Sequence, residues 1–160
     1  MDKLDFTGIT AFIGKAALTG ISGAATTNSS TAGAFSLKGK AITHATDSGV
    51  ATPTTDAVTA AAITLVANQA RVVVFCLDSA DAVKLVAGEV VALDSAGAFL
   101  DAPEFPSLPD TLCPMAYVIV KGGATLSGTF TVGSSNWNTT GMTYVVTDTF
   151  GMPDRPQTAA

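Results

Sequence analysis

The chain has 160 residues, a net charge of −5 and a charged fraction of 13%, about half the ~25% that is usual in globular domains. Its few Lys and Arg residues are scattered, so no basic surface can neutralise a phosphate backbone and no nucleic-acid partner is expected. Although 48% of the residues are hydrophobic, no apolar run approaches the ~20 residues that span a bilayer, so no membrane partner is expected.

The low charge leaves two interpretations open. The chain is either a stable β protein with a Thr- and Ser-rich surface, or a protein whose surface largely meets other protein, because interface centres are depleted in charge. We favour the second interpretation, since a free monomer is normally kept soluble by more charge.

The N-terminus and the cysteines indicate a reducing compartment. Residues 1–5 are acidic where a secretion signal is basic, so no signal peptide is expected. Cys76 and Cys113 are too few for a disulfide scaffold and too far apart for a C-x-x-C zinc site. We expect both to be free thiols that pack as small apolar side chains.

Residues 1–34 differ in character from the rest and predict an N-terminal arm with a flexible linker. Apolar residues from Leu4 to Ala16 follow a loose helical stripe, which glycines weaken. Residues 24–33 are small and polar, as in a linker. The segment is either a disordered terminus or an arm that docks on a partner through large apolar anchors, namely Leu4, Phe6, Phe12 and Ile13.

A β-domain is predicted over residues 35–150. It begins with strands at 34–37 and 41–43, joined by a turn, and continues with a loop at 47–53. Residues 56–68 suit either a helix or a strand, and we favour a strand ending near Asn68 because Thr and Ile are frequent.

Residues 71–121 predict a β-meander. Residues 72–77 are apolar on both faces, as in a buried strand. The sequence that follows, 77–83, nearly repeats at 93–99. Each copy places an Asp first in a four-residue turn, where its carboxylate can accept backbone N–H bonds. The repeat therefore predicts two consecutive hairpins.

The later segments complete an all-β pattern. Prolines punctuate residues 103–114, which are predicted to run extended over the surface or along an edge. Strands follow at 115–120, 126–132 and 142–148. Many short strands with regular turn signals predict a single antiparallel β-sandwich or barrel. Its predicted core, within a folded unit from Phe35 to Asp148, contains Val72, Val74, Phe75, Leu77, Val91, Tyr117, Ile119 and Phe130.

No recognisable catalytic or metal-binding motif is present. His44 is the only histidine, from which we expect neither a histidine-based triad nor a multi-histidine zinc site. The closely spaced carboxylates lie in turns, at too low a density for calcium. We therefore expect no enzyme, no metal and no cofactor, with a small hydrolase as the least favoured alternative.

Two further places are candidate interaction sites. Trp137 stands in a polar loop, where its ring either folds back over the end of the sheet or is an exposed anchor, as an interface hot spot or a stacking surface for sugar. Residues 151–160 form an extended tail, in which Arg155 offers a forked donor to a partner carboxylate. We place Arg155 and Gln157 at an interface with a neighbouring subunit.

Six segments in order complete the sequence evidence: FSLKGK at 35–40, LDSA at 77–80, GEVV at 88–91, FPSLPD at 105–110, PMAYVIV at 114–120 and PDRPQ at 153–157. Over residues 35–157 the chain resembles small virion proteins of tailed bacteriophages that decorate or cement a capsid. The resemblance implies a non-enzymatic homotrimer, made in the host cytoplasm, that binds major capsid protein on the outside of the virion. The alternative is a receptor- or glycan-binding module of a phage fibre or tail, with Trp137 as its stacking platform.

Overall fold

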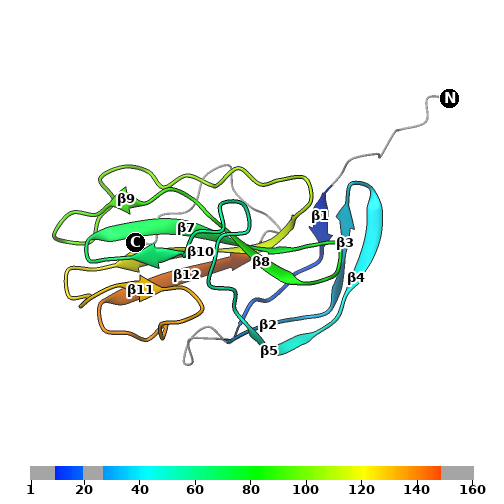
Figure 1. Ribbon diagram of the computed structural model, residues 1–160, viewed down its shortest axis with the longest axis horizontal. Helices are drawn as coiled ribbons and strands as arrows, with labels where there is room; N and C mark the ends of the chain where they lie inside the picture. The colour runs from blue at the N-terminus through cyan, green and yellow to red at the C-terminus, as the bar shows by residue number, and fades with distance from the viewer. Residues whose placement is uncertain (1–9, 20–26, 149–160) are drawn as a thin grey trace.

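A computed structural model of the protein describes residues 10–19 and 27–148, and in these residues the protein is all-β, as predicted (Figure 1). No helix occurs among them, and hence none that could cross a membrane. The strands are β1 (Ala11–Ile13), β2 (Thr27–Ser30), β3 (Gly33–Leu37), β4 (Lys40–His44), β5 (Asp47–Ala51), β6 (Thr64–Leu65), β7 (Gln69–Leu77), β8 (Val83–Ala87), β9 (Val91–Ala92), β10 (Cys113–Gly122), β11 (Phe130–Thr131) and β12 (Met142–Asp148).

An antiparallel five-stranded sheet forms the centre of the fold. Its order is β12-β10-β7-β8, and β9 pairs with β7 on the same side as β8. The central strands β7 and β10 are buried along almost their whole length, which explains why their sequences are apolar on both faces. The predicted hairpin of β7 and β8 is therefore confirmed, but the prediction of a meander is wrong, because β9 and β10 both pair with β7 instead of with the strand before them.

The main core lies on one face of this sheet, where β1 and β3 contact β10, and β6 contacts β7. The five-stranded sheet is one layer and the elements packed on this face are the second, which gives a sandwich-like arrangement. Figure 1 shows the β1-β3-β4 sheet at one end of the molecule, and β9 and β11 at the other. The largest apolar side chains of the main core include Phe12, Phe35, Leu65, Phe75, Phe130 and Trp137.

The opposite face of the five-stranded sheet is covered by the proline-rich connection between β9 and β10. Phe99, Phe105 and Leu108 of this connection pack on a second buried cluster. The Phe105 ring meets Tyr117 edge-on at 4.9 Å between centroids. The prediction that this segment runs over the sheet is confirmed for residues 103–112, whereas Cys113 and Pro114 belong to the central strand β10, in which an irregularity of register follows Pro114.

The two repeated turns share one geometry, as their sequences predict. Asp78 Oδ1 accepts bonds from the backbone N–H groups of Ala80 and Ala82 at 2.8 and 3.0 Å. Asp94 Oδ1 accepts the equivalent pair, both at 2.8 Å. The fourth position of each turn is left-handed, with φ of 61° at Asp81 and 80° at Gly97. Glycine adopts this conformation without strain, whereas an aspartate there needs a compensating interaction.

The described part of the predicted arm belongs to the fold. β1 pairs with β3, and β2 pairs with β5. These residues therefore form neither the helical stripe nor the flexible linker that the sequence indicated, and the predicted boundary at residue 34 falls inside β3. The remaining residues of that arm, 1–9 and 20–26, lie outside the described residues.

Three other segments differ from their predictions. Residues 47–51, predicted as a loop, form β5, which is held by its pairing with β2. Residues 56–68 contain the short β6, and residues 126–132 only the short β11. Gly128, with a φ of 78°, interrupts the second of these extended runs. The predicted core is buried as expected, except that Val91 is half-buried on the short edge strand β9.

The Asp56 carboxylate fixes the turn before β6 to the edge of β8. It accepts bonds from Val58 N, Thr59 N and the Thr59 hydroxyl, while its second oxygen accepts one from Ala87 N at 2.7 Å. Burial alone would raise the pKa of Asp56, but the three backbone donors and the hydroxyl outweigh it, so that the pKa lies below its ordinary value of 3.8.

Acid is therefore expected to destabilise the fold through Asp56. A depressed folded-state pKa contributes stability that is present above the unfolded-state pKa and is lost as the pH falls through the folded-state value. Relative to the Asp56→Asn variant, the wild type should be more stable at neutral pH by roughly 1–3 kcal/mol, and this difference should shrink below the ordinary pKa of 3.8. Urea unfolding between pH 7 and pH 2.5 measures it. A difference that does not change over this range would contradict the assignment.

Candidate functional site

The outward face of the β1-β3-β4 sheet carries two rows of uncharged side chains. The strand register aligns Phe12, Phe35 and Ile42 toward the core, so that the residues on either side of them point outward. Ile13 is 66% exposed on this face. The outward rows, which we call the uncharged face, are Ala11, Ser36 and Ala41, and Ile13, Ala34 and Thr43.

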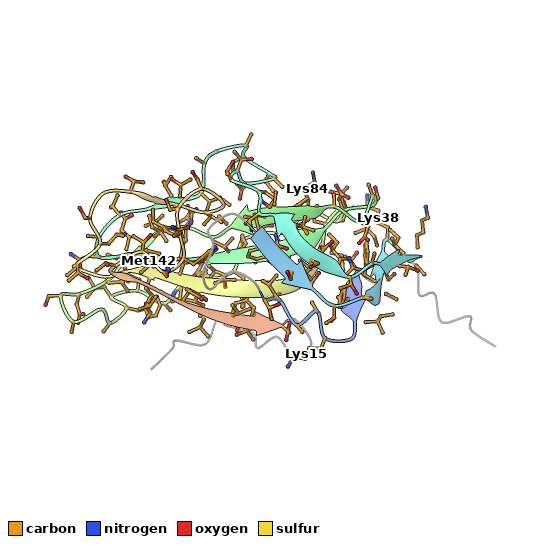
Figure 2. The ribbon with its side chains drawn as sticks, turned by 90° about the horizontal axis from the view of Figure 1, so that it is seen from below. Lys15, Lys38, Lys84 and Met142 are labelled. Atoms are coloured by element: carbon orange, nitrogen blue, oxygen red, sulfur yellow. The ribbon has the colours of Figure 1, made fainter. Side chains whose placement is uncertain are left out.

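Three exposed lysines form ion pairs with aspartates. Lys15, Lys38 and Lys84, which are labelled in Figure 2, each lie within 4 Å of one aspartate carboxylate, at 3.7, 3.0 and 3.6 Å respectively. Such exposed pairs contribute little to stability.

The predicted anchors have separate fates. Ile13 is exposed, whereas its neighbour Phe12 is buried, because adjacent residues of a strand point to opposite faces. The Phe12 ring lies edge-on to His44, at 6.0 Å between centroids, so the prediction that Phe12 reaches a partner is wrong for this fold. Leu4, Phe6, Arg155 and Gln157 lie outside the described residues.

Trp137 is fully buried, and the interpretation as an exposed anchor is wrong. Its ring lies between Phe130 and Tyr144, edge-on to each, at 5.4 and 5.3 Å between centroids. The polar loop around it folds back over the sheet, so neither ring face is available to stack on a sugar. Its Nε1 has no hydrogen-bond partner among the described residues.

A serine, a histidine and an aspartate meet where three parts of the fold join. His44 Nδ1 lies 2.6 Å from Asp81 Oδ1, and His44 Nε2 lies 2.8 Å from Ser30 Oγ. Asp81 Oδ2 also accepts a bond from Ala45 N at 3.1 Å. These are the contacts of a Ser-His-Asp triad. A triad needs only one histidine. The presence of a single histidine was therefore not a valid reason to expect no such arrangement.

The same cluster has no access for a substrate. His44 is fully buried and Ser30 is 3% exposed. The Ser30 hydroxyl also lies 3.3 Å from Asp47 Oδ2, to which it donates. Because a nucleophile must reach the reacting atom, the cluster acts as a polar cross-link between β2, β4 and the first repeated turn.

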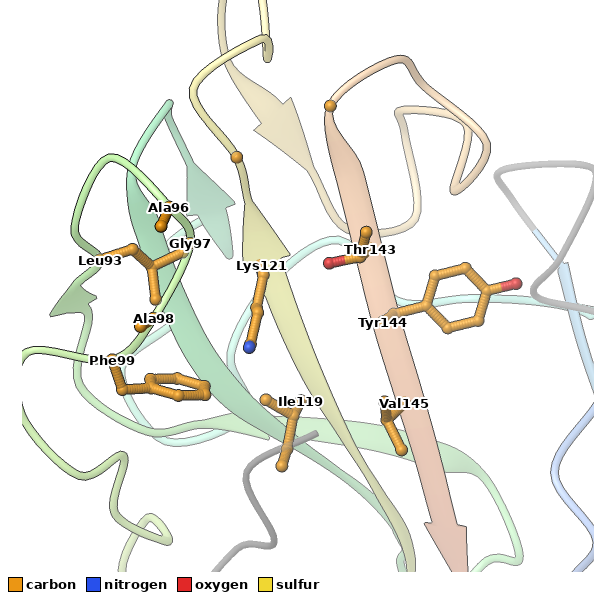
Figure 3. A pocket seen from close by; sticks show the side chains of 12 residues that line it. Leu93, Ala96, Gly97, Ala98, Phe99, Ile119, Lys121, Thr143, Tyr144 and Val145 are labelled. Atoms are coloured by element: carbon orange, nitrogen blue, oxygen red, sulfur yellow. The ribbon is translucent and has the colours of Figure 1, made fainter. Parts of the chain in front are cut away.

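A groove lies at the other end of the molecule, beside the edge strand β12. Its volume is about 850 Å³, and it runs between the hairpin at residues 93–99 and β12. In Figure 3 Ile119 and Lys121 of β10 form its floor, with Val145 beside them, while Tyr144 points away. Lys121 Nζ lies 4.2 Å from the centroid of the Phe99 ring. The lining contains no carboxylate, histidine or thiol, and hence no catalytic set.

No family model, curated protein or solved structure matches the chain.

Metal-ligating and thiol groups add no further site. Among residues 10–19 and 27–148, no group of three or more His, Cys, Asp or Glu side chains is placed to hold a metal ion. Cys76 and Cys113 are free and buried, as predicted. They belong to the clusters on opposite faces of the central sheet, so they do not face each other. Burial raises the pKa of both thiols, that of Cys113 to about 11, and leaves them unreactive.

Proposed function

We propose that this protein is a structural virion component that decorates the outside of a bacteriophage capsid and binds major capsid protein. The observation that carries the proposal is that Ile13, on the uncharged face, is 66% exposed among uncharged side chains. Its strand, β1, comes soon after residues 1–9 in the sequence. The resemblance of residues 35–157 to capsid decoration proteins supports it.

The uncharged face is suited to docking on a subunit surface. Covering one side chain of the size of Ile13 contributes roughly 1.5–3 kcal/mol, and the small neighbours Ala34 and Ala41 allow a partner backbone to approach closely. Leu4 and Phe6 precede this face by a few residues and would extend the contact. A trimer would present three such faces, and linked weak contacts give high avidity.

The proposal predicts that Ile13→Asp weakens attachment to the capsid. An aspartate at this position would be buried without a partner in the interface, so we expect at least a roughly tenfold loss of affinity. Binding is measured by co-sedimentation with particles that lack the protein, with electron microscopy and mass spectrometry of purified virions.

The matched control is Val58→Asp, because Val58 is 58% exposed in a turn outside the uncharged face. This variant should bind like the wild type. Equal binding by Ile13→Asp, or absence of the chain from virions, would refute the proposal. Light scattering of the free protein checks the trimer separately.

The alternative, a glycan-binding module, is disfavoured by the burial of Trp137, since this ring was to be its stacking platform. An enzyme is disfavoured by the burial of Ser30 and His44. We therefore retain the non-enzymatic role.

A further inference from the structure

The cover on the second face of the central sheet is incomplete at β12. The proline-rich connection packs over β7, β8 and β10 through Phe99, Phe105 and Leu108. Beyond it, the β12 side chains on the same face as Ile119 and Lys121 are Val145 and Thr143, both of which line the groove. Val145 is 39% exposed. An apolar strip of the sheet therefore lies open along the groove (Figure 3).

β12 is also an unprotected edge strand. Within the described residues it pairs with β10 alone, over seven residues in unbroken register. It contains no proline and no lysine, and its one charged residue is Asp148 at its end. Long regular edges of this kind normally carry a charge, a proline or a bulge, or are covered by another segment. A covering segment is therefore expected.

Lys121 adds an electrostatic requirement. It is the one charged residue among those that line the groove. Its ammonium group lies over the Phe99 ring and forms no ion pair within the described part of the chain. A segment that covers the groove would remove water from this group, so it must bring a carboxylate.

We propose that residues 149–160 of the same chain fold back over β12 and occupy this groove. The segment leaves directly from Asp148, and its twelve residues reach roughly 40 Å when extended, against about 23 Å for the seven residues of β12. Phe150 and Met152 supply apolar side chains, and Asp154 supplies the carboxylate.

The spacing of Asp154 brings it to the part of the groove that contains Val145. Thr143 lies opposite Lys121 in the β10–β12 ladder and is five residues from Asp148, while Asp154 is six residues beyond it. A chain that reverses over a two-residue turn after Asp148 thus returns Asp154 to the level of Val145, which lines the groove two residues from Thr143. Direct attachment at Asp148 also gives this segment a high effective concentration at its own groove. This assignment does not depend on the capsid role, and it differs from placing Arg155 and Gln157 on a neighbouring subunit.

The test is the rate at which a thiol reagent labels Val145→Cys in the full chain and in a chain that ends at Asp148. The native thiols are buried and leave a low background. If residues 149–160 cover the groove, labelling should be about tenfold slower in the full chain. The matched control is Val58→Cys, 58% exposed and outside the groove, which should react equally fast in both chains.

A full-length variant keeps the test decisive if the shortened chain fails to fold. Replacing Asp154 by Lys in the Val145→Cys protein should speed labelling, because two ammonium groups would then meet in the groove. Equal labelling rates in the full-length, shortened and Asp154→Lys proteins would overturn the proposal. Protection that appears only at concentrations where light scattering detects oligomers would overturn it too, since the occupant would then be a second copy.

Discussion

Replacement of Trp137 by alanine is expected to lower the free energy of unfolding by about 3–5 kcal/mol, the usual cost of removing a large buried aromatic side chain. Trp137 is fully buried and contacts Phe130 and Tyr144 edge-on. Its loss opens a cavity between the polar loop and the sheet that these two rings cannot fill. Denaturant unfolding followed by circular dichroism measures the loss, because the variant has no tryptophan fluorescence.

Trp137→Phe is the matched control. It keeps an aromatic ring against Phe130 and Tyr144, and it removes an indole N–H that has no partner among the described residues, so it should lose clearly less stability than the alanine variant. If Trp137→Ala unfolds at the same denaturant concentration as wild type, the ring does not belong to the core.

Replacement of Asp81 by glycine is expected to cost roughly 1–3 kcal/mol, although glycine suits the backbone there. Asp81 has a φ of 61°, and the second repeated turn has Gly97 at the equivalent position. On conformational grounds alone the substitution would be neutral or stabilising. The loss of stability follows because the buried His44 ring and Ala45 N lose their acceptor.

A double-mutant cycle isolates this contribution. In a His44→Gln background, Asp81→Gly should cost less than in the wild type, with a coupling of about 0.5–3 kcal/mol for residues in contact. Thermal unfolding of the four proteins gives the coupling. A stabilising effect of Asp81→Gly in the wild type would mean that the contact with His44 contributes nothing.

Local signals made the central sheet predictable. The two turns follow from Asp78 and Asp94, whose carboxylates organise a few adjacent residues. The apolar sequences of β7 and β10 show directly that both of their faces are buried. In each case the determining interactions lie within the segment itself.

The smaller sheets were missed because distant residues hold them. β2 and β5 have the small polar composition of a linker, yet Asn28 Nδ2 lies 3.2 Å from Thr52 Oγ1, and Ser30 Oγ bonds His44. No local pattern encodes these contacts. The burial of Trp137 was ambiguous for the same reason, since its neighbours Asn136 and Asn138 are polar and its partners lie elsewhere.

The candidate site was predicted in part. The exposure of Ile13 agrees with its expected role as an anchor, but Phe12 was assigned with it because the segment was taken for a helix. The cluster of Ser30, His44 and Asp81 joins residues from two strands and a turn. Its one sequence signal is the aspartate that stands where the repeat has Gly97.

The alternation along β7 has an evolutionary consequence. Val73 belongs to the main core, and the adjacent Val74 to the cluster beneath the proline-rich connection. Residues that are neighbours in the chain therefore share few packing partners, whereas Val74 and Tyr117, far apart in sequence, share one cluster. Substitutions on the two faces should combine additively, so each core can drift in composition while the other stays unchanged.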